Sequence, residues 1–113
     1  MQFRIHRNPN DTFQNIVNRF TYALGCRLAI KIRFQSEDAV DQELFVQFTS
    51  CANLTDIPRG FCFSGIFIMP DQREKPAAHP GNILIYKRPD ETIEALAHVN
   101  MNVAIEAPPS RLP

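Results

Sequence analysis

Three cysteines and three histidines are the side chains best suited to catalysis in this chain. Their positions are Cys26, Cys51, Cys62, His6, His79 and His98. A thiol and an imidazole that meet in space can act as nucleophile and base, but none of these residues has the CxxC or HxxxH spacing of a metal site. Cys26 and Cys62 lie in apolar strand patterns, typical of small core residues, and Cys51 is expected to be the reachable thiol. We therefore expect no enzyme, no cofactor and no metal, with a cryptic cysteine-dependent enzyme as the second alternative function.

A short run that begins at Arg59 has the order basic, glycine, aromatic, small, aromatic. It resembles the start of the first ribonucleoprotein motif of RNA-recognition domains, which implies that Phe61 and Phe63 would stack bases on an open sheet. Ser64 replaces an aliphatic residue of that motif and Ile66 replaces its last aromatic residue, and a proline-rich loop follows where the family has a helix. We therefore favour packing of both phenylalanines in the core.

Apolar and polar residues alternate from Cys26 to Gln35, a pattern typical of a strand with one buried face and one wet, basic face. A shorter alternation in residues 1–7 predicts another strand beside it. The basic face shared by the two strands consists of Arg4, His6, Arg27, Lys31 and Arg33. It could bind a phosphate backbone. Because the wet face carries no aromatic residue and the formal net charge is zero, we favour a solvated face or the docking site of an acidic protein.

One helix is expected from Thr12 to Leu24. Asp11 is a good N-cap, Gly25 is a good C-terminal stop, and apolar residues recur between them at helical spacing. The apolar face is expected to pack against a sheet through Phe13, Ile16, Val17 and Phe20.

Four more strands are expected at 43–50, 61–69, 82–88 and 101–105, with a short second helix opened by Pro89, Asp90 and Glu91. Residues 61–69 are apolar on both faces. Their expected inward set is Phe61, Phe63, Phe67 and Met69, which leaves Ile66 and Ile68 as an apolar patch on the other face. Residues 70–81 are expected to form a long exposed loop that carries Arg73 and Lys75.

The predicted order is β-α-β-β-β-β-α-β in a single α+β domain over residues 1–107, followed by a flexible tail at 108–113. A mostly antiparallel sheet with two helices on one face, as a ferredoxin-like variant, is the first expectation. A cystatin-like curved sheet around a long helix is the alternative.

The function expected from these patterns is a non-enzymatic protein–protein interaction domain of the inhibitor, immunity or adaptor type. It would act through a sheet face or through the 70–81 loop, and we expect a homodimer. The candidate surface consists of Arg4, His6, Arg27, Lys31, Arg33, Ile66, Ile68, Arg73 and Lys75. The alternative is a single-stranded nucleic-acid-binding protein that uses the basic face, with Arg59, Phe61 and Phe63 as further candidates. With no signal-peptide pattern and no apolar run of about 20 residues, we expect a cytoplasmic protein without a membrane partner.

Overall fold

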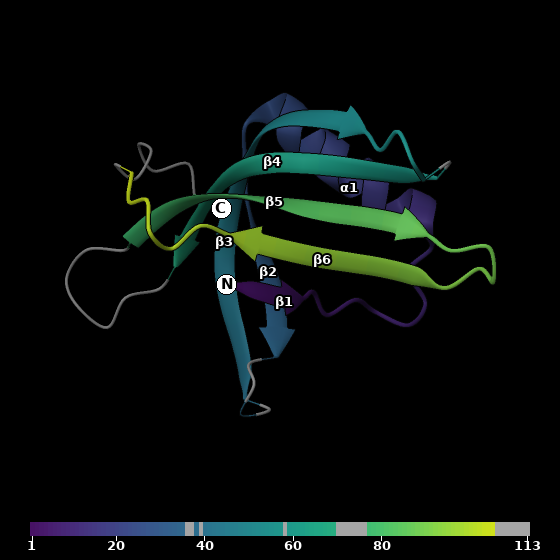
Figure 1. Cartoon of the computed structure of the whole chain (residues 1–113), viewed down its shortest axis with the longest axis horizontal. Helices are drawn as coiled ribbons and strands as arrows, with labels where there is room; N and C mark the ends of the chain where they lie inside the picture. Colours follow the sequence, from purple (N-terminus) through teal and green to yellow (C-terminus); the bar gives the residue numbers. More distant parts are fainter. Residues whose placement is uncertain (36–37, 39, 58, 70–76, 106–113) are drawn as a thin grey trace.

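Six strands and one helix make up the regular structure of the described residues, which are 1–35, 38, 40–57, 59–69 and 77–105 of this computed structural model. In chain order they are β1 (Gln2–Arg4), α1 (Phe13–Cys26), β2 (Ala29–Gln35), β3 (Asp41–Asn53), β4 (Gly60–Met69), β5 (Ala77–Lys87) and β6 (Ile93–Val99). The strands form one antiparallel sheet in the order β1-β6-β5-β4-β3-β2 (Figure 1). Among the described residues, no helix is both long enough and apolar enough to cross a membrane.

The sheet curls until its first and last strands meet. An antiparallel bridge joins Ile5 to Phe34, and the His6 N–H donates to the Arg33 carbonyl oxygen at 2.8 Å. The Phe3 ring stacks on Phe34 with 4.2 Å between the ring centroids. The right-handed twist of successive strands produces such curling, and here the short β1 closes the gap between β6 and β2.

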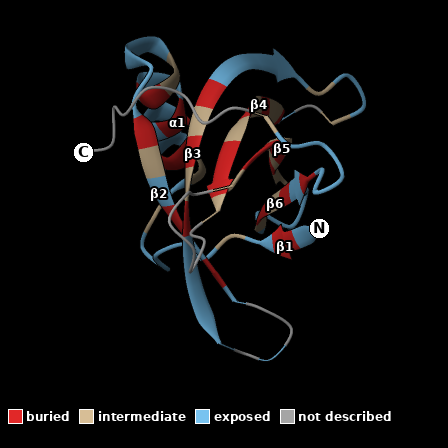
Figure 2. Ribbon diagram, turned by 90° about the vertical axis from the view of Figure 1, so that its left-hand side faces the viewer, coloured by how far each residue is buried: buried red, intermediate tan, exposed pale blue. Residues whose placement is uncertain are grey.

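Helix α1 packs its apolar face on the inner side of the curled sheet, as its 3.6-residue periodicity predicted. Ile16, Val17, Phe20 and Ala23 are buried there. The inner side chains of the strands join the same core, most fully Leu44, Val46, Phe48, Phe63, Phe67, Ile83, Ile85 and Val99. Figure 2 shows the buried segments of α1, β3 and β4 facing the interior. The core therefore consists of one layer of helix and one layer of curved sheet.

The helix begins and ends at residues other than those predicted. Its N-cap is Thr12, whose Oγ1 accepts from the Asn15 N–H at 3.1 Å, whereas Asp11 forms an ion pair with Arg19. The helix continues through Gly25, and the left-handed residue that stops it is Arg27, with φ of 54°. The predicted glycine stop was wrong because hydrogen bonds to the last carbonyl groups can hold a non-glycine residue in this conformation. Strand β2 consequently begins at Ala29, three residues later than expected.

The predicted second helix was wrong, because residues 93–99 form β6 between β5 and β1. The expected opening of that helix is a tight connection, in which Asp90 Oδ1 accepts from the Thr92 N–H at 3.1 Å and the Arg88 N–H donates to the Thr92 carbonyl at 2.8 Å. Ala95 and Ala97 are both buried on the inner face, which is the alternation of a strand. Burial of this face outweighed the helix propensity of the two alanines. The expected last strand is reduced to a single bridge between Ile105 and Ala78.

The molecule is therefore a small α+β protein with a curled six-stranded antiparallel sheet and one helix, and not the two-helix, ferredoxin-like arrangement. It has the outline of the alternative expectation, a curved sheet around a helix. The expected 70–81 loop was wrong for residues 77–81, which belong to β5, and residues 70–76 lie outside the described residues. Arg73, Lys75 and the predicted tail at 108–113 lie outside the described residues.

Candidate functional site

The predicted basic face carries four exposed residues of β1, β2 and the segment between β1 and α1, and each of the four has an acidic partner. The pairs are Arg4–Glu94 at 3.8 Å, His6–Asp41 at 3.9 Å, Lys31–Glu43 at 3.7 Å and Arg33–Glu43 at 3.6 Å. The register explains Glu43, because β3 places it directly opposite Arg33. These pairings offset much of the positive charge that a phosphate backbone would need. Nucleic-acid binding by this face stays a prediction that no contact among the described residues favours.

Arg27 does not belong to that face. It lies in the turn between α1 and β2, and none of the described residues forms an ion pair with its guanidinium group. Its exposed side chain lines a hollow together with Gln47 and Thr49 of β3, and neither Lys31 nor Arg33 is among the residues of that lining. The predicted basic strand face is thus divided, and Arg27 belongs to the separate site described below.

The two phenylalanines of the short ribonucleoprotein-like run are on the inner face of β4. Phe63 is completely buried, and Phe61 is half-buried, with its ring centroid 6.2 Å from that of Phe13. Arg59 is paired with Glu91 at 3.2 Å. Core packing, the interpretation favoured from the sequence, is confirmed, and Phe63 is not available for base stacking.

The apolar patch expected over Ile66 and Ile68 is smaller than predicted. Ile68 lies between Phe45 of β3 and Ala78 of β5 and is only 8% exposed. Ile66 is half-buried beside Pro80. Because the neighbouring outward side chains cover Ile68, this face does not present both isoleucines to a partner.

The thiols do not form a catalytic arrangement with the histidines. Cys26 is exposed at the end of α1 and not in the core, Cys62 is half-buried, and Cys51 is exposed as predicted. Burial raises the pKa of the Cys51 thiol, and the nearby Cys62 raises it further, which keeps Cys51 protonated at neutral pH. Among the described residues, no hydrogen bond joins a cysteine to a histidine, and no group of three potential ligands could hold a metal ion.

A hollow of about 420 Å³ lies beside the β5–β6 connection and contains three basic residues, Arg59, Lys87 and Arg88. Glu91 pairs with Arg59 at 3.2 Å and with Lys87 at 2.7 Å, while Arg88 pairs with Glu94 at 2.8 Å. Hydrogen bonds from Lys87 and then Arg59 lower the pKa of Glu91, so this carboxylate stays ionised. The three basic residues of this hollow are therefore already paired with carboxylates, which makes the hollow a weak candidate for binding an anion.

The second half of β3 is an open edge of the sheet, as far as the structure describes it. Strand β3 has 13 residues, whereas β2 has 7 and pairs only with residues 41–47 of β3. From Phe48 to Asn53, β3 has β4 on one side and no described strand on the other, as the upper edge of Figure 1 shows. We call residues Thr49 to Asn53 the free edge of β3.

The free edge arises from a turn and a bulge. The chain between α1 and β2 bends away from β3 at Arg27, so β2 cannot extend past Gln47. Thr49 is an extra residue in β3, and it shifts the register between Phe48 and Ser50. Beyond this bulge, residues 50–53 pair regularly with residues 61–64 of β4.

The backbone groups that face outward can be identified from the register. The Leu54 N–H donates to the Gly60 carbonyl at 3.0 Å, and antiparallel pairs alternate between hydrogen-bonded and non-bonded residues. Ala52 therefore bonds to β4, whereas Cys51 and Asn53 direct their N–H and C=O groups away from it. No backbone group of the described residues pairs with these donors and acceptors of the free edge.

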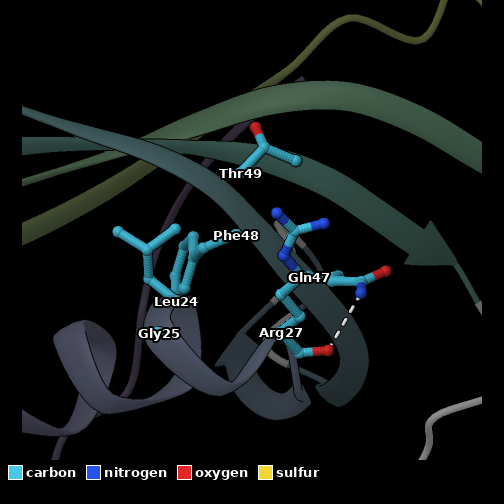
Figure 3. Close-up of a pocket in the computed structure, with 6 residues that line it drawn as sticks. All are labelled: Leu24, Gly25, Arg27, Gln47, Phe48 and Thr49. Carbon is cyan, nitrogen blue, oxygen red and sulfur yellow. Dashed lines mark hydrogen bonds between the residues drawn. The ribbon is translucent and has the colours of Figure 1, made fainter.

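A hollow of about 470 Å³ lies where the free edge meets the start of β2. Figure 3 shows the Arg27 side chain rising from the turn toward β3, between Leu24 and Phe48 on one side and Gln47 on the other. The Gln47 side-chain amide donates to the Arg27 carbonyl oxygen at 2.9 Å, which fixes the turn against β3. Gly25 and Thr49 also line the hollow, and none of its described lining residues carries a carboxylate.

This site was not predicted from the sequence, because the alternation of apolar and polar residues stops at Ser50, where the strand was expected to end. The available signal was the composition of residues 49–53, which combine small and polar residues without charge or proline. No family model matches the chain, and neither a curated protein nor a solved structure was found to be similar to it.

Proposed function

We propose that this protein binds another protein by accepting one of its extended segments as an additional strand on the free edge of β3. A domain that holds a partner in this way can act as an inhibitor, an immunity protein or an adaptor. The proposal is supported by the backbone of Cys51 and Asn53, for which the described part of the chain provides no hydrogen-bond partner on the outer side of β3.

An exposed strand edge is a template for pairing with another chain, and proteins usually protect such edges. The usual protection consists of lysine or other charged side chains, proline, or a covering loop. Residues 49–53 contain no charged residue and no proline, and all five are exposed in the part of the chain that the structure describes. The Thr49 bulge distorts only the start of the edge, since pairing with β4 is regular beyond it. The edge is therefore suited to strand addition.

The added segment would take the place that β2 leaves empty. It would continue the line of β2 beside β3 and exchange hydrogen bonds with Cys51 and Asn53. Small side chains at Ser50 and Ala52 put no bulk in its path on the outer face. Main-chain hydrogen bonds would supply affinity, and the hollow beside Arg27 would supply selectivity.

The experiment selects binding peptides from displayed random libraries and measures their affinity for two variants at one position. Cys51→Pro removes the outward N–H without removing a hydrogen bond to β4, and we expect it to weaken peptide binding at least tenfold. Cys51→Ser keeps this N–H and removes only the thiol, so it should bind like the wild type. Asn53→Pro provides a second proline variant if Cys51→Pro is unfolded.

Two results would contradict the proposal. Peptides that bind Cys51→Pro and Asn53→Pro as tightly as the wild type would show that they do not add to this edge. Loss of binding in Cys51→Ser alone would favour thiol chemistry over strand pairing. If the added strand comes from a second copy of the chain, sedimentation of the wild type will show a dimer, and Cys51→Pro will be a monomer. That result would mean that the partner is the expected homodimer and not a foreign protein.

A further inference from the structure

We infer that the segment accepted by the free edge of β3 is the C-terminus of the partner, whose terminal carboxylate binds the Arg27 guanidinium. This inference rests on the proposed strand addition and names its ligand more closely. It follows from the direction of the added strand, from the place where that strand must stop, and from the charge at that place.

The direction comes from the sheet. All neighbouring strands are antiparallel, and antiparallel pairing is slightly more stable than parallel pairing. A segment antiparallel to β3 runs in the same direction as β2, which is itself antiparallel to β3. Its first residues would therefore lie opposite Asn53, and its last residues would lie near Thr49.

The stopping point comes from β2. The place beside Gln47 is already filled by Ala29, and the Leu28 N–H is bonded to the Ala23 carbonyl at 3.1 Å, so this turn is fixed to α1. An added strand that runs toward Thr49 meets the start of β2 end to end. A chain that terminates there fits the space without having to leave the sheet.

The charge at the junction distinguishes a C-terminus from an N-terminus. Arg27 has no ion pair with any of the described residues, in contrast to Arg4, Arg33 and Arg59. A guanidinium group offers parallel N–H donors that match a carboxylate, and it would repel a terminal ammonium group. The Gln47 amide uses one N–H on the Arg27 carbonyl and has a second N–H to offer.

The hollow also indicates the terminal side chain. Leu24 is half-buried and lies beside the buried Phe48, and together they form an apolar wall opposite Gln47, with Arg27 between (Figure 3). A volume of about 470 Å³ accepts an aliphatic side chain together with a carboxylate. The chemical class of the ligand is thus an extended peptide with an uncharged edge-binding stretch and an aliphatic C-terminal residue.

The test uses random peptides displayed with free C-termini, the best of which are synthesised as free acids and as C-terminal amides. We expect the wild type to bind the amide at least tenfold more weakly, as the loss of a charge-assisted hydrogen bond implies. Arg27→Gln should weaken the binding of the free acid by a similar factor and leave the affinity for the amide nearly unchanged. Arg19→Gln, an exposed arginine elsewhere on α1, is the matched control and should bind both peptides like the wild type.

Equal affinity for acid and amide in the wild type would overturn the inference, even if Arg27→Gln failed to fold. If Cys51→Pro still abolished binding in that case, strand addition would stand and only the carboxylate would be wrong. Failure to select any peptide whose binding depends on Cys51 would overturn both the inference and the proposed function.

Discussion

Phe20→Ala is expected to lower the free energy of unfolding by about 3–5 kcal/mol. Phe20 is 4% exposed, and its ring contacts Phe48 and Phe63, with 5.1 and 5.4 Å between the ring centroids. Because these rings come from α1, β3 and β4, truncation leaves a cavity where the helix meets the sheet. Surrounding aromatic rings are too rigid to collapse into it fully.

Chemical denaturation of the wild type and Phe20→Ala checks this prediction. Thr21→Ala is the control on the same helix, since Thr21 is exposed, and it should change stability by no more than about 0.5 kcal/mol. A loss below about 1 kcal/mol for Phe20→Ala would mean that the helix does not pack on the sheet.

Gly65→Ala is expected to cost about 1–3 kcal/mol, because β3 approaches β4 at this position too closely for a methyl group. A Cβ atom on Gly65 would overlap the Gln47 carbonyl oxygen and lie 2.9 Å from the Phe48 Cα. Both are backbone atoms beside the Thr49 bulge, so the strand itself must move.

Gly25→Ala is the matched control, measured by the same denaturation experiment. Apart from its chain neighbours and the helix backbone, no described atom lies within 4 Å of a Cβ on Gly25, which is inside α1 without a positive φ. The substitution should stabilise the protein by about 0.5–1 kcal/mol. A neutral Gly65→Ala, or a destabilised Gly25→Ala, would contradict the close strand approach and the observed end of the helix, respectively.

Periodicity predicted the elements whose apolar residues face one side. Phe13, Ile16, Val17 and Phe20 repeat at helical spacing, and the alternation in residues 29–35 and 61–69 placed the inward faces of β2 and β4 correctly. Such periodic patterns arise because the buried face of a helix or strand must be apolar, so they can be recognised in the sequence alone.

The end of α1 and the identity of β6 could not be predicted in the same way. Arg27 stops the helix through bonds to carbonyl groups, a role that its side chain does not reveal. Residues 93–99 contain alanines that fit a helix, and only pairing with β5 and β1 makes them a strand. Such outcomes depend on contacts between distant segments.

The candidate site depended on the same distant contacts. Lys31 and Arg33 were identified from the sequence, but their partner Glu43 follows only from the register of β2 and β3. Arg27 was identified as basic, yet its separation from that face results from the turn before β2. The free edge arises from a difference in strand length, which no local pattern encodes.

Amide hydrogen exchange in the isolated protein tests the free edge most directly. At a concentration where sedimentation shows a monomer, the Cys51 and Asn53 amides should exchange rapidly, whereas the Ala52 amide, bonded to β4, should be protected. Saturation with a selected peptide should then slow exchange at Cys51 and Asn53. If both amides are already as protected as Ala52 in the free monomer, the edge is covered and the account of this protein as a strand-accepting domain is wrong.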